Sequence, residues 1–307
     1  MNDTDLHQFY LSLVVRLRHQ GVLCAITSGL ACVHFGVAET TKDCDLLCHS
    51  RDFSVLLEEL ARTKVNGLAC RYRGNLSPPL DDRWHRGGWT SHFNWGRGPE
   101  AVTFDVFGRA LRGSSDWERE LVGLYVNPHI VAEMKRTNRK KDWAFITALG
   151  AKLIRAGDAR GWRHVFRADT LRELIATHAC PPAEAARRPA LALALSGDPH
   201  CAGALHAEQL LWEKLDELRI EIYRRALRPY NTAVRKSQVT EVTPLLKEHE
   251  IRLGCAEAIL APTPLTDYGV GRHIEDARRA LVVEGVIPAE ALDWLPDLTG
   301  NFRYLDT

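Results

Sequence analysis

The sequence predicts an α+β fold, with a mixed β-sheet flanked by helices in residues 1–155 and an α-helical domain in residues 156–307. In the first half, short apolar runs bounded by glycine or polar turns alternate with helical patterns. In the second half, helical spacing predominates. A chain of 307 residues is also long enough for roughly two domains.

The first half opens with a helix, a strand and a second helix. Apolar side chains recur at three- and four-residue intervals from Leu6 to Leu17, which predicts an amphipathic helix that ends near Gly21. The short apolar run at 22–27 is typical of a strand, and Ser28-Gly29 ends it. A short helix closed by Gly36 is predicted next.

Four further strands are predicted in the first half, two of them as neighbours. Each is a short apolar run, and in several of them apolar and polar residues alternate. In chain order we expect a strand at 43–48, a helix at 53–60, a strand at 68–73, a loop at 74–88, and two strands at 90–95 and 101–108 that are joined by a turn at 96–99.

Two aspartates, Asp43 and Asp45, lie one residue apart in the predicted strand 43–48. Successive side chains of a strand point to opposite faces, so these two share one face. If the strand that carries Asp105 lies beside them, three carboxylates converge. Such a cluster is electrostatically costly unless a divalent cation with oxygen ligands neutralises it. The sequence therefore predicts a Mg²⁺ site, with Mn²⁺ as the alternative ion.

The Ser28-Gly29 turn precedes the start of a predicted helix. Backbone N–H groups and the positive end of a helix dipole suit a phosphate group at such a position. A metal site and a phosphate site together indicate nucleotide chemistry.

The order of these motifs resembles the DNA polymerase β-like nucleotidyltransferases. The family signature is a Gly-Gly or Gly-Ser pair, then an Asp-x-Asp motif, and then a carboxylate on a later strand. Here the corresponding residues are Ser28-Gly29, Asp43 with Asp45, and Asp105.

Two further matches are similar to the bacterial branch of this family that includes AbiEii-type toxins. That branch carries a Thr-x-Asp-x-Asp-Leu motif, which Thr41 begins here and Leu46 ends. The segment "EMKRTNRKKDWAFITALGAKLI" also resembles a helical segment of the family. Its matching residues are Lys135, Arg139, Lys141 and Asp142.

The resemblance implies a Mg²⁺-dependent enzyme that moves a nucleoside monophosphate from an NTP to an acceptor and releases pyrophosphate. Asp43 and Asp45 would bind the ion on the phosphates, and Asp105 would bind a second ion and activate the acceptor hydroxyl. The predicted nucleotide-binding residues are Ser28, Gly29, Lys135, Arg139 and Asp142, with Lys135 as a mobile cation for the triphosphate.

The acceptor stays open at this point. A tRNA 3′ end, a protein side chain and a small hydroxylated molecule such as an aminoglycoside are the candidates, and a toxin–antitoxin pair is one setting that the resemblance suggests. The alternative function is a non-catalytic nucleotide-binding or interaction module on the same fold.

The second half is predicted to be helical. Helical patterns cover 167–179, 202–227 and 242–261, and we expect the second of these helices to end near Pro229. Five basic residues near that end form either an RNA-binding patch or a solvated helix end. They are Arg224, Arg225, Arg228, Arg235 and Lys236.

Composition excludes some classes of protein. The formal charge of +1 argues against nucleic-acid binding by bulk charge alone. The sequence has no run of about 18 apolar residues and no signal-peptide pattern, so we expect a cytoplasmic protein with no membrane partner. Its eight cysteines lack CxxC spacing, which favours buried thiols over zinc ligands. Aromatic residues at 84–95 are predicted to pack in the core, with base stacking as the alternative.

Overall fold

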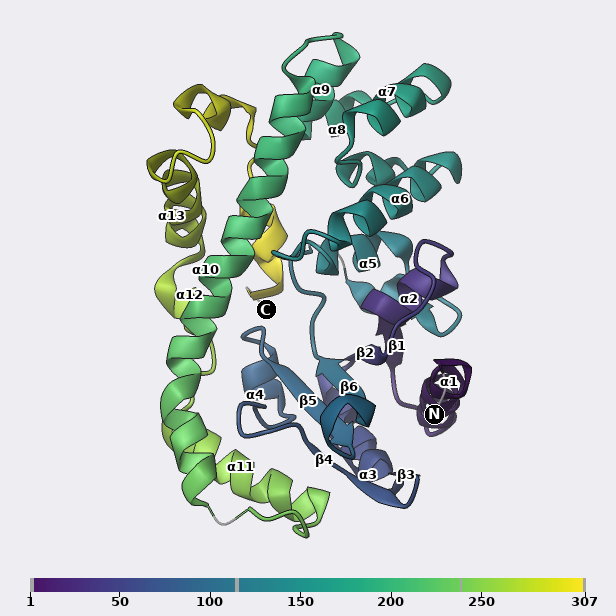
Figure 1. Cartoon of the computed structure of the whole chain (residues 1–307), viewed down its shortest axis with the longest axis vertical. Helices are drawn as coiled ribbons and strands as arrows, with labels where there is room; N and C mark the ends of the chain where they lie inside the picture. Colours follow the sequence, from purple (N-terminus) through teal and green to yellow (C-terminus); the bar gives the residue numbers. More distant parts are fainter. Residues whose placement is uncertain (1–2, 114–115, 238, 306–307) are drawn as a thin grey trace.

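The computed structural model describes residues 3–113, 116–237 and 239–305 (Figure 1). In these residues eight strands form one sheet in the order β3-β4-β5-β6-β2-β1-β8-β7. The pairs β2/β6 and β1/β8 are parallel and the other neighbours are antiparallel, which confirms the predicted mixed sheet. The strands are β1 Cys24–Thr27, β2 Asp43–Cys48, β3 Lys64–Val65, β4 Leu68–Tyr72, β5 Thr90–Trp95, β6 Val102–Phe107, β7 Leu121–Val122 and β8 Tyr125–Val126.

Helices flank this sheet and form most of the second half (Figure 1). In the first half they are α1 Asp3–His19, α2 Ser28–His34, α3 Phe53–Arg62, α4 Asp82–His85, α5 Pro128–Met134 and α6 Asp142–Arg155. Those that follow are α7 Ala168–Thr177, α8 Pro182–Arg187, α9 Pro189–Leu195, α10 Cys201–Lys236, α11 Leu245–Ile259, α12 Pro264–Tyr268 and α13 Val270–Val283.

The central strands bury one face and leave the other for the site. Burial alternates along β5 and β6, as the sequence pattern predicts. Helix α1 packs on the buried face, where Phe9 meets Trp95 with ring centroids 5.3 Å apart. The hydroxyl of Tyr10 donates a hydrogen bond to the Thr103 carbonyl at 2.8 Å. The opposite face carries the polar side chains of these strands.

Helix α10 is longer than the sequence predicts. We expected it to end near Pro229, but it continues to Lys236 with the proline inside it. Proline removes one backbone hydrogen bond from a helix, and tertiary contacts compensate here. The next residue, Tyr230, is fully buried, and its hydroxyl donates to the Ser77 carbonyl at 2.9 Å. Packing of α10 against the first half therefore outweighs the tendency of Pro229 to end the helix.

The two halves of the chain share one hydrophobic core. The main cluster of buried residues includes side chains of the sheet and of helices α10, α11 and α13. Trp84 and Trp89 donate from their indole N–H groups to the carbonyls of Leu260 and Ala261, at 3.1 Å each. Both indoles are buried, as the core interpretation predicts. Figure 1 shows α10 running along the length of the molecule, past the edge of the sheet.

Some elements were absent from the sequence prediction. The predicted loop at 74–88 contains the short helix α4, and the hairpin of β7 and β8 extends the sheet beyond β1. Strands of two residues carry too little periodicity to be recognised. Across the described residues, no helix has both the length and the apolar character that a membrane span requires.

Candidate functional site

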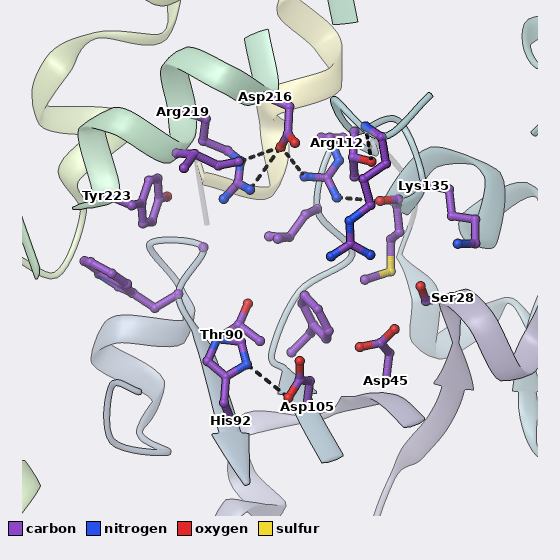
Figure 2. Close-up of a pocket in the computed structure, with 18 of the residues that line it drawn as sticks. Ser28, Asp45, Thr90, His92, Asp105, Arg112, Lys135, Asp216, Arg219 and Tyr223 are labelled. Atoms are coloured by element: carbon purple, nitrogen blue, oxygen red, sulfur yellow. Dashed lines mark hydrogen bonds and ion pairs between the residues drawn. The ribbon is translucent and has the colours of Figure 1, made fainter. Parts of the chain in front are cut away.

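The carboxylates that the sequence brings together lie on adjacent strands. β2 and β6 are parallel, and Asp45 is paired in register with Asp105. Asp43 precedes Asp45 by two residues on the same face, and all three line one cavity. Figure 2 shows Asp45 and Asp105 at the floor of this cavity. The predicted adjacency of the two strands is confirmed.

Thr41 and Gly29 fix the position of Asp43. The Thr41 hydroxyl donates to Asp43 Oδ1 at 2.7 Å, and His7 of α1 contacts the Thr41 carbonyl at 2.9 Å. A Cβ atom at Gly29 would lie 2.5 Å from Thr41 Oγ1. The sequence suggested that glycine here admits a phosphate. In the structure, the side chain of Thr41 also leaves no room for a Cβ atom at position 29.

Ser28 begins helix α2 in a rare backbone conformation. Its φ of 54° lies in the left-handed region, which costs energy for a residue other than glycine. Its side chain hydrogen-bonds the Asp45 carboxylate. The side chain of Ser28 therefore already contacts one of the carboxylates at the floor of the cavity.

The surroundings of Asp45 disfavour the ionised form of its carboxyl group. Burial raises the pKa of its carboxyl group, and the charges of Asp43 and Asp105 raise it further, to about 7. The Ser28 hydrogen bond and the charge of Lys135 only partly oppose this. A cation near Asp45 would relieve both the burial cost and the repulsion.

Asp105, in contrast, already has cationic and polar neighbours. Its Oδ1 lies 2.9 Å from Arg73 Nη2 and 3.0 Å from His92 Nδ1, and Arg73 Nη2 also donates to its Oδ2 at 2.9 Å. Burial acts to raise the pKa of the Asp105 carboxyl. The hydrogen bond from His92 and the charge of Arg73 outweigh burial and lower that pKa overall.

Lys135 differs from its predicted role as a mobile cation. It follows α5 and is buried, and its Nζ lies 3.1 Å from Asp142 Oδ1 at the start of α6. The Thr137 hydroxyl donates to the other oxygen of Asp142 at 3.2 Å. Asp142 therefore acts as the partner of Lys135. The pair still lines the cavity, but it is fixed by packing and by its own ion pair.

Of the exposed cations in this loop, Arg139 is the one that faces the cavity. It lines the same cavity and is exposed to solvent. Within the residues that the structure describes, no ion pair to its guanidinium is recorded. Arg139, and not the buried Lys135, is therefore the solvent-exposed basic residue at the cavity.

The roof of the cavity is an ionic cluster centred on Asp216 of α10. Asp216 Oδ1 lies 3.1 Å from Arg112 Nη1 and 3.0 Å from Arg219 Nη2. Its Oδ2 accepts a hydrogen bond from the Asn138 backbone N–H at 3.1 Å. Figure 2 shows this cluster across the cavity from Asp45 and Asp105. Helix α10 is thereby joined to two loops of the first half.

One end of the cavity is apolar. The rings of Trp89 and Tyr223 meet edge to face with centroids 4.7 Å apart, and Ile220 and Leu227 of α10 line the wall beside them. The cavity volume is about 340 Å³. Known small-molecule sites span about 300–1,000 Å³, so the space suits a ligand of modest size.

The residues at the floor fit a metal ion only together with ligand oxygens. Among the described residues, no three His, Cys, Asp or Glu side chains are grouped to hold an ion by themselves. Mg²⁺ is commonly bound by one or two carboxylates and completed by substrate phosphates. The raised pKa of Asp45, with Asp43 beside it, is consistent with that arrangement.

Several residues of the site were missed in the sequence. His92 lies on β5, next to the strand of Asp105, and Arg73 directly follows β4 on the far side of β5. Both are distant from Asp105 along the chain, so the sequence did not indicate that they contact it. The residues of α10 at 216, 219, 220, 223 and 227 follow helical spacing, so one face of that helix could have been recognised. The sequence could not show, however, that α10 is the helix that covers the carboxylates.

Comparison with known proteins returned no match: no protein-family model, no curated protein and no solved structure matches the chain.

Proposed function

We propose that this protein is a nucleotidyltransferase that uses Mg²⁺ to move a nucleoside monophosphate from an NTP to an acceptor hydroxyl. The observation that carries the proposal is the in-register pair of Asp45 and Asp105, with Asp43 on the same face, at the floor of a cavity. Carboxylates on adjacent strands facing a cavity with basic walls suit a metal-bound polyphosphate.

Asp43 and Asp45 would hold the metal ion. When bound, Mg²⁺ neutralises charge on the phosphates and makes the α-phosphorus a better electrophile. The acceptor oxygen then bonds to the α-phosphorus, and the bond from that phosphorus to its bridging oxygen breaks. Pyrophosphate leaves with the bonding electrons. Asp105, on the next strand, receives the proton of the acceptor hydroxyl.

Basic and apolar walls supply the remaining contacts. Arg139 is exposed at the cavity and suits the departing pyrophosphate, while the buried Lys135 contributes a fixed positive charge near Asp45. The apolar end at Trp89 and Tyr223 suits a nucleobase or an apolar part of the acceptor.

The first test is a screen for transfer. The protein is incubated with each of the four α-³²P-labelled NTPs, with Mg²⁺ or with EDTA, and with total RNA, cell protein or an aminoglycoside as acceptor. We expect label to move to one acceptor class only when Mg²⁺ is present. NTP binding without transfer to any class would favour the non-catalytic nucleotide-binding module.

A further inference from the structure

A row of charged and polar side chains crosses the sheet at the level of the carboxylates. Arg73 directly follows β4 and donates its backbone N–H to the His92 carbonyl at 2.8 Å. His92 is paired with Asp105, and Asp105 with Asp45. Across neighbouring strands the order is therefore guanidinium, imidazole, carboxylate, carboxylate.

One nitrogen of Arg73 contacts both oxygens of Asp105 and donates its hydrogen bond to Oδ2. Its Nη2 lies 2.9 Å from Oδ1 and 2.9 Å from Oδ2, and 3.0 Å from His92 Nδ1. A second metal ion at Asp105 would need an oxygen that the guanidinium already contacts. It would also lie beside a fixed positive charge, which repels it.

The helical half fixes the backbone on both sides of Arg73. Arg252 of α11 donates to the Gly74 carbonyl at 2.7 Å, and its guanidinium lies 4.7 Å from the centre of the Tyr72 ring. Arg252 is buried and paired with Glu248 at 2.7 Å. The position of Arg73 is thus built into the fold, although 38% of its side chain stays exposed.

We propose that Arg73 takes the place of a second metal ion at Asp105, so that the site binds a single divalent cation together with its nucleotide. This rests on the proposed nucleotidyltransferase function. Arg73 is a positioning residue that acts through Asp105: it neutralises the carboxylate and holds it toward the cavity. Asp43 and Asp45 keep the one ion.

The contrast between the two paired carboxylates supports a single-ion site. Asp105 lies 2.9 Å from a guanidinium nitrogen of Arg73 and 3.0 Å from His92 Nδ1. Among the described residues, no basic side chain lies within ion-pair distance of its strand neighbour Asp45, so a cation would be needed there and not at Asp105. The competing arrangement uses Asp105 Oδ1, a buried atom without a well-directed hydrogen bond, as a ligand of a second ion.

Counting bound ions separates these arrangements. Mn²⁺ is titrated into the full chain with the α,β-methylene analogues of ATP, CTP, GTP and UTP in turn, and electron paramagnetic resonance counts the Mn²⁺ that is bound. We expect one ion per chain in the wild type and two in Arg73→Gln. Arg71→Gln is the matched control, because Arg71 lies on β4 two residues before Arg73 and pairs with Glu248, 3.7 Å away, instead of with Asp105. It should bind one ion.

Asp105→Asn gives a second readout that does not depend on the Arg73 variant folding. If Arg73 replaces the second ion, Asp105→Asn still binds one ion. Two ions in the wild type, falling to one in Asp105→Asn, would overturn the inference and leave the nucleotidyltransferase proposal standing. One ion in a folded Arg73→Gln would also overturn it. No Mn²⁺ bound with any analogue would overturn both proposals.

Discussion

At the scale of single residues, the Asp45 carboxylate destabilises the fold that carries it. Burial and two neighbouring carboxylates raise its pKa from 3.8 to about 7. Between those values the folded protein keeps a proton that the unfolded chain has released. Stability therefore falls as the pH rises from about 4 to about 7, and the loss is complete above the folded pKa.

Removing this charge should stabilise the metal-free protein. We expect Asp45→Asn to raise the free energy of unfolding at pH 8 by about 1–2 kcal/mol and to change it little at pH 4, since the side chain is only partly buried. Urea unfolding at both pH values in EDTA measures the difference. Asp116→Asn, at a side chain that is 75% exposed, is the control and should have no such pH dependence. Equal stability of wild type and Asp45→Asn at pH 8 would contradict the claim that the Asp45 charge destabilises the metal-free fold.

Gly29 provides a steric prediction. Its Cβ would lie 2.5 Å from Thr41 Oγ1, so Gly29→Ala should destabilise the protein by about 1–3 kcal/mol. Thr41→Ala removes that oxygen and also a hydrogen bond to Asp43. In the double variant the 2.5 Å contact with Oγ1 is removed and only the 3.2 Å contact with the Thr41 Cβ atom remains, so its loss of stability should be smaller than the sum of the two single losses. Thermal unfolding of the three variants measures the coupling. Strictly additive losses would contradict a close contact between position 29 and Thr41.

At the scale of elements, helix α10 continues through Pro229 because of contacts that are distant in sequence. Pro229 is exposed, so its ring packs on little, and its position in the helix leaves the Arg225 carbonyl without its usual N–H donor. We expect Pro229→Ala to raise the free energy of unfolding by about 1–3 kcal/mol. Arg228→Ala, at the exposed neighbouring position, should change it by less than about 0.5 kcal/mol. A lower free energy of unfolding for Pro229→Ala would mean that the proline ring makes stabilising contacts.

The elements also show what sequence patterns can predict. β5 and β6 were predictable because buried and less buried residues alternate along them, and β2 because it is a short, mostly apolar run that begins with alternation. The alternation placed Asp43 and Asp45 on one face of β2 and left Asp105 on the less buried face of β6. The end of α10 was not predictable, because Tyr230 packs against residues about 150 positions away, a contact that local propensity does not encode. The ion pair of Lys135 was hidden for the same reason: a basic residue near a motif looks the same in sequence whether it is mobile or buried.

At the scale of the whole molecule, Asp216 joins the helical half to the loops above the carboxylates. It is buried and pairs with Arg112 and Arg219, and it accepts the Asn138 N–H. Both arginine charges, rather than solvent, keep the pKa of its carboxyl low against the effect of burial. Residues of both halves therefore line the cavity, and this cluster lies where the halves meet.

Breaking this junction should be costly. Asp216→Asn leaves a buried arginine charge without its counter-ion, so we expect a loss of about 3 kcal/mol in the free energy of unfolding. The neighbouring Glu217→Gln is the control, because its side chain is 52% exposed. Guanidinium unfolding compares the two. A loss below about 1 kcal/mol for Asp216→Asn would mean that the halves dock without this cluster.

The most direct measurement of the central claim is the rate of label transfer from an α-³²P-labelled NTP by wild type, Asp43→Asn and Asp45→Asn in Mg²⁺. Both variants keep the shape of the side chain and remove a metal ligand. Each should lose at least about a hundredfold in rate while its unfolding midpoint in EDTA stays equal to or above that of wild type. Asp116→Asn should transfer at the wild-type rate. Transfer by either variant at close to the wild-type rate would contradict the assignment of these carboxylates to the metal.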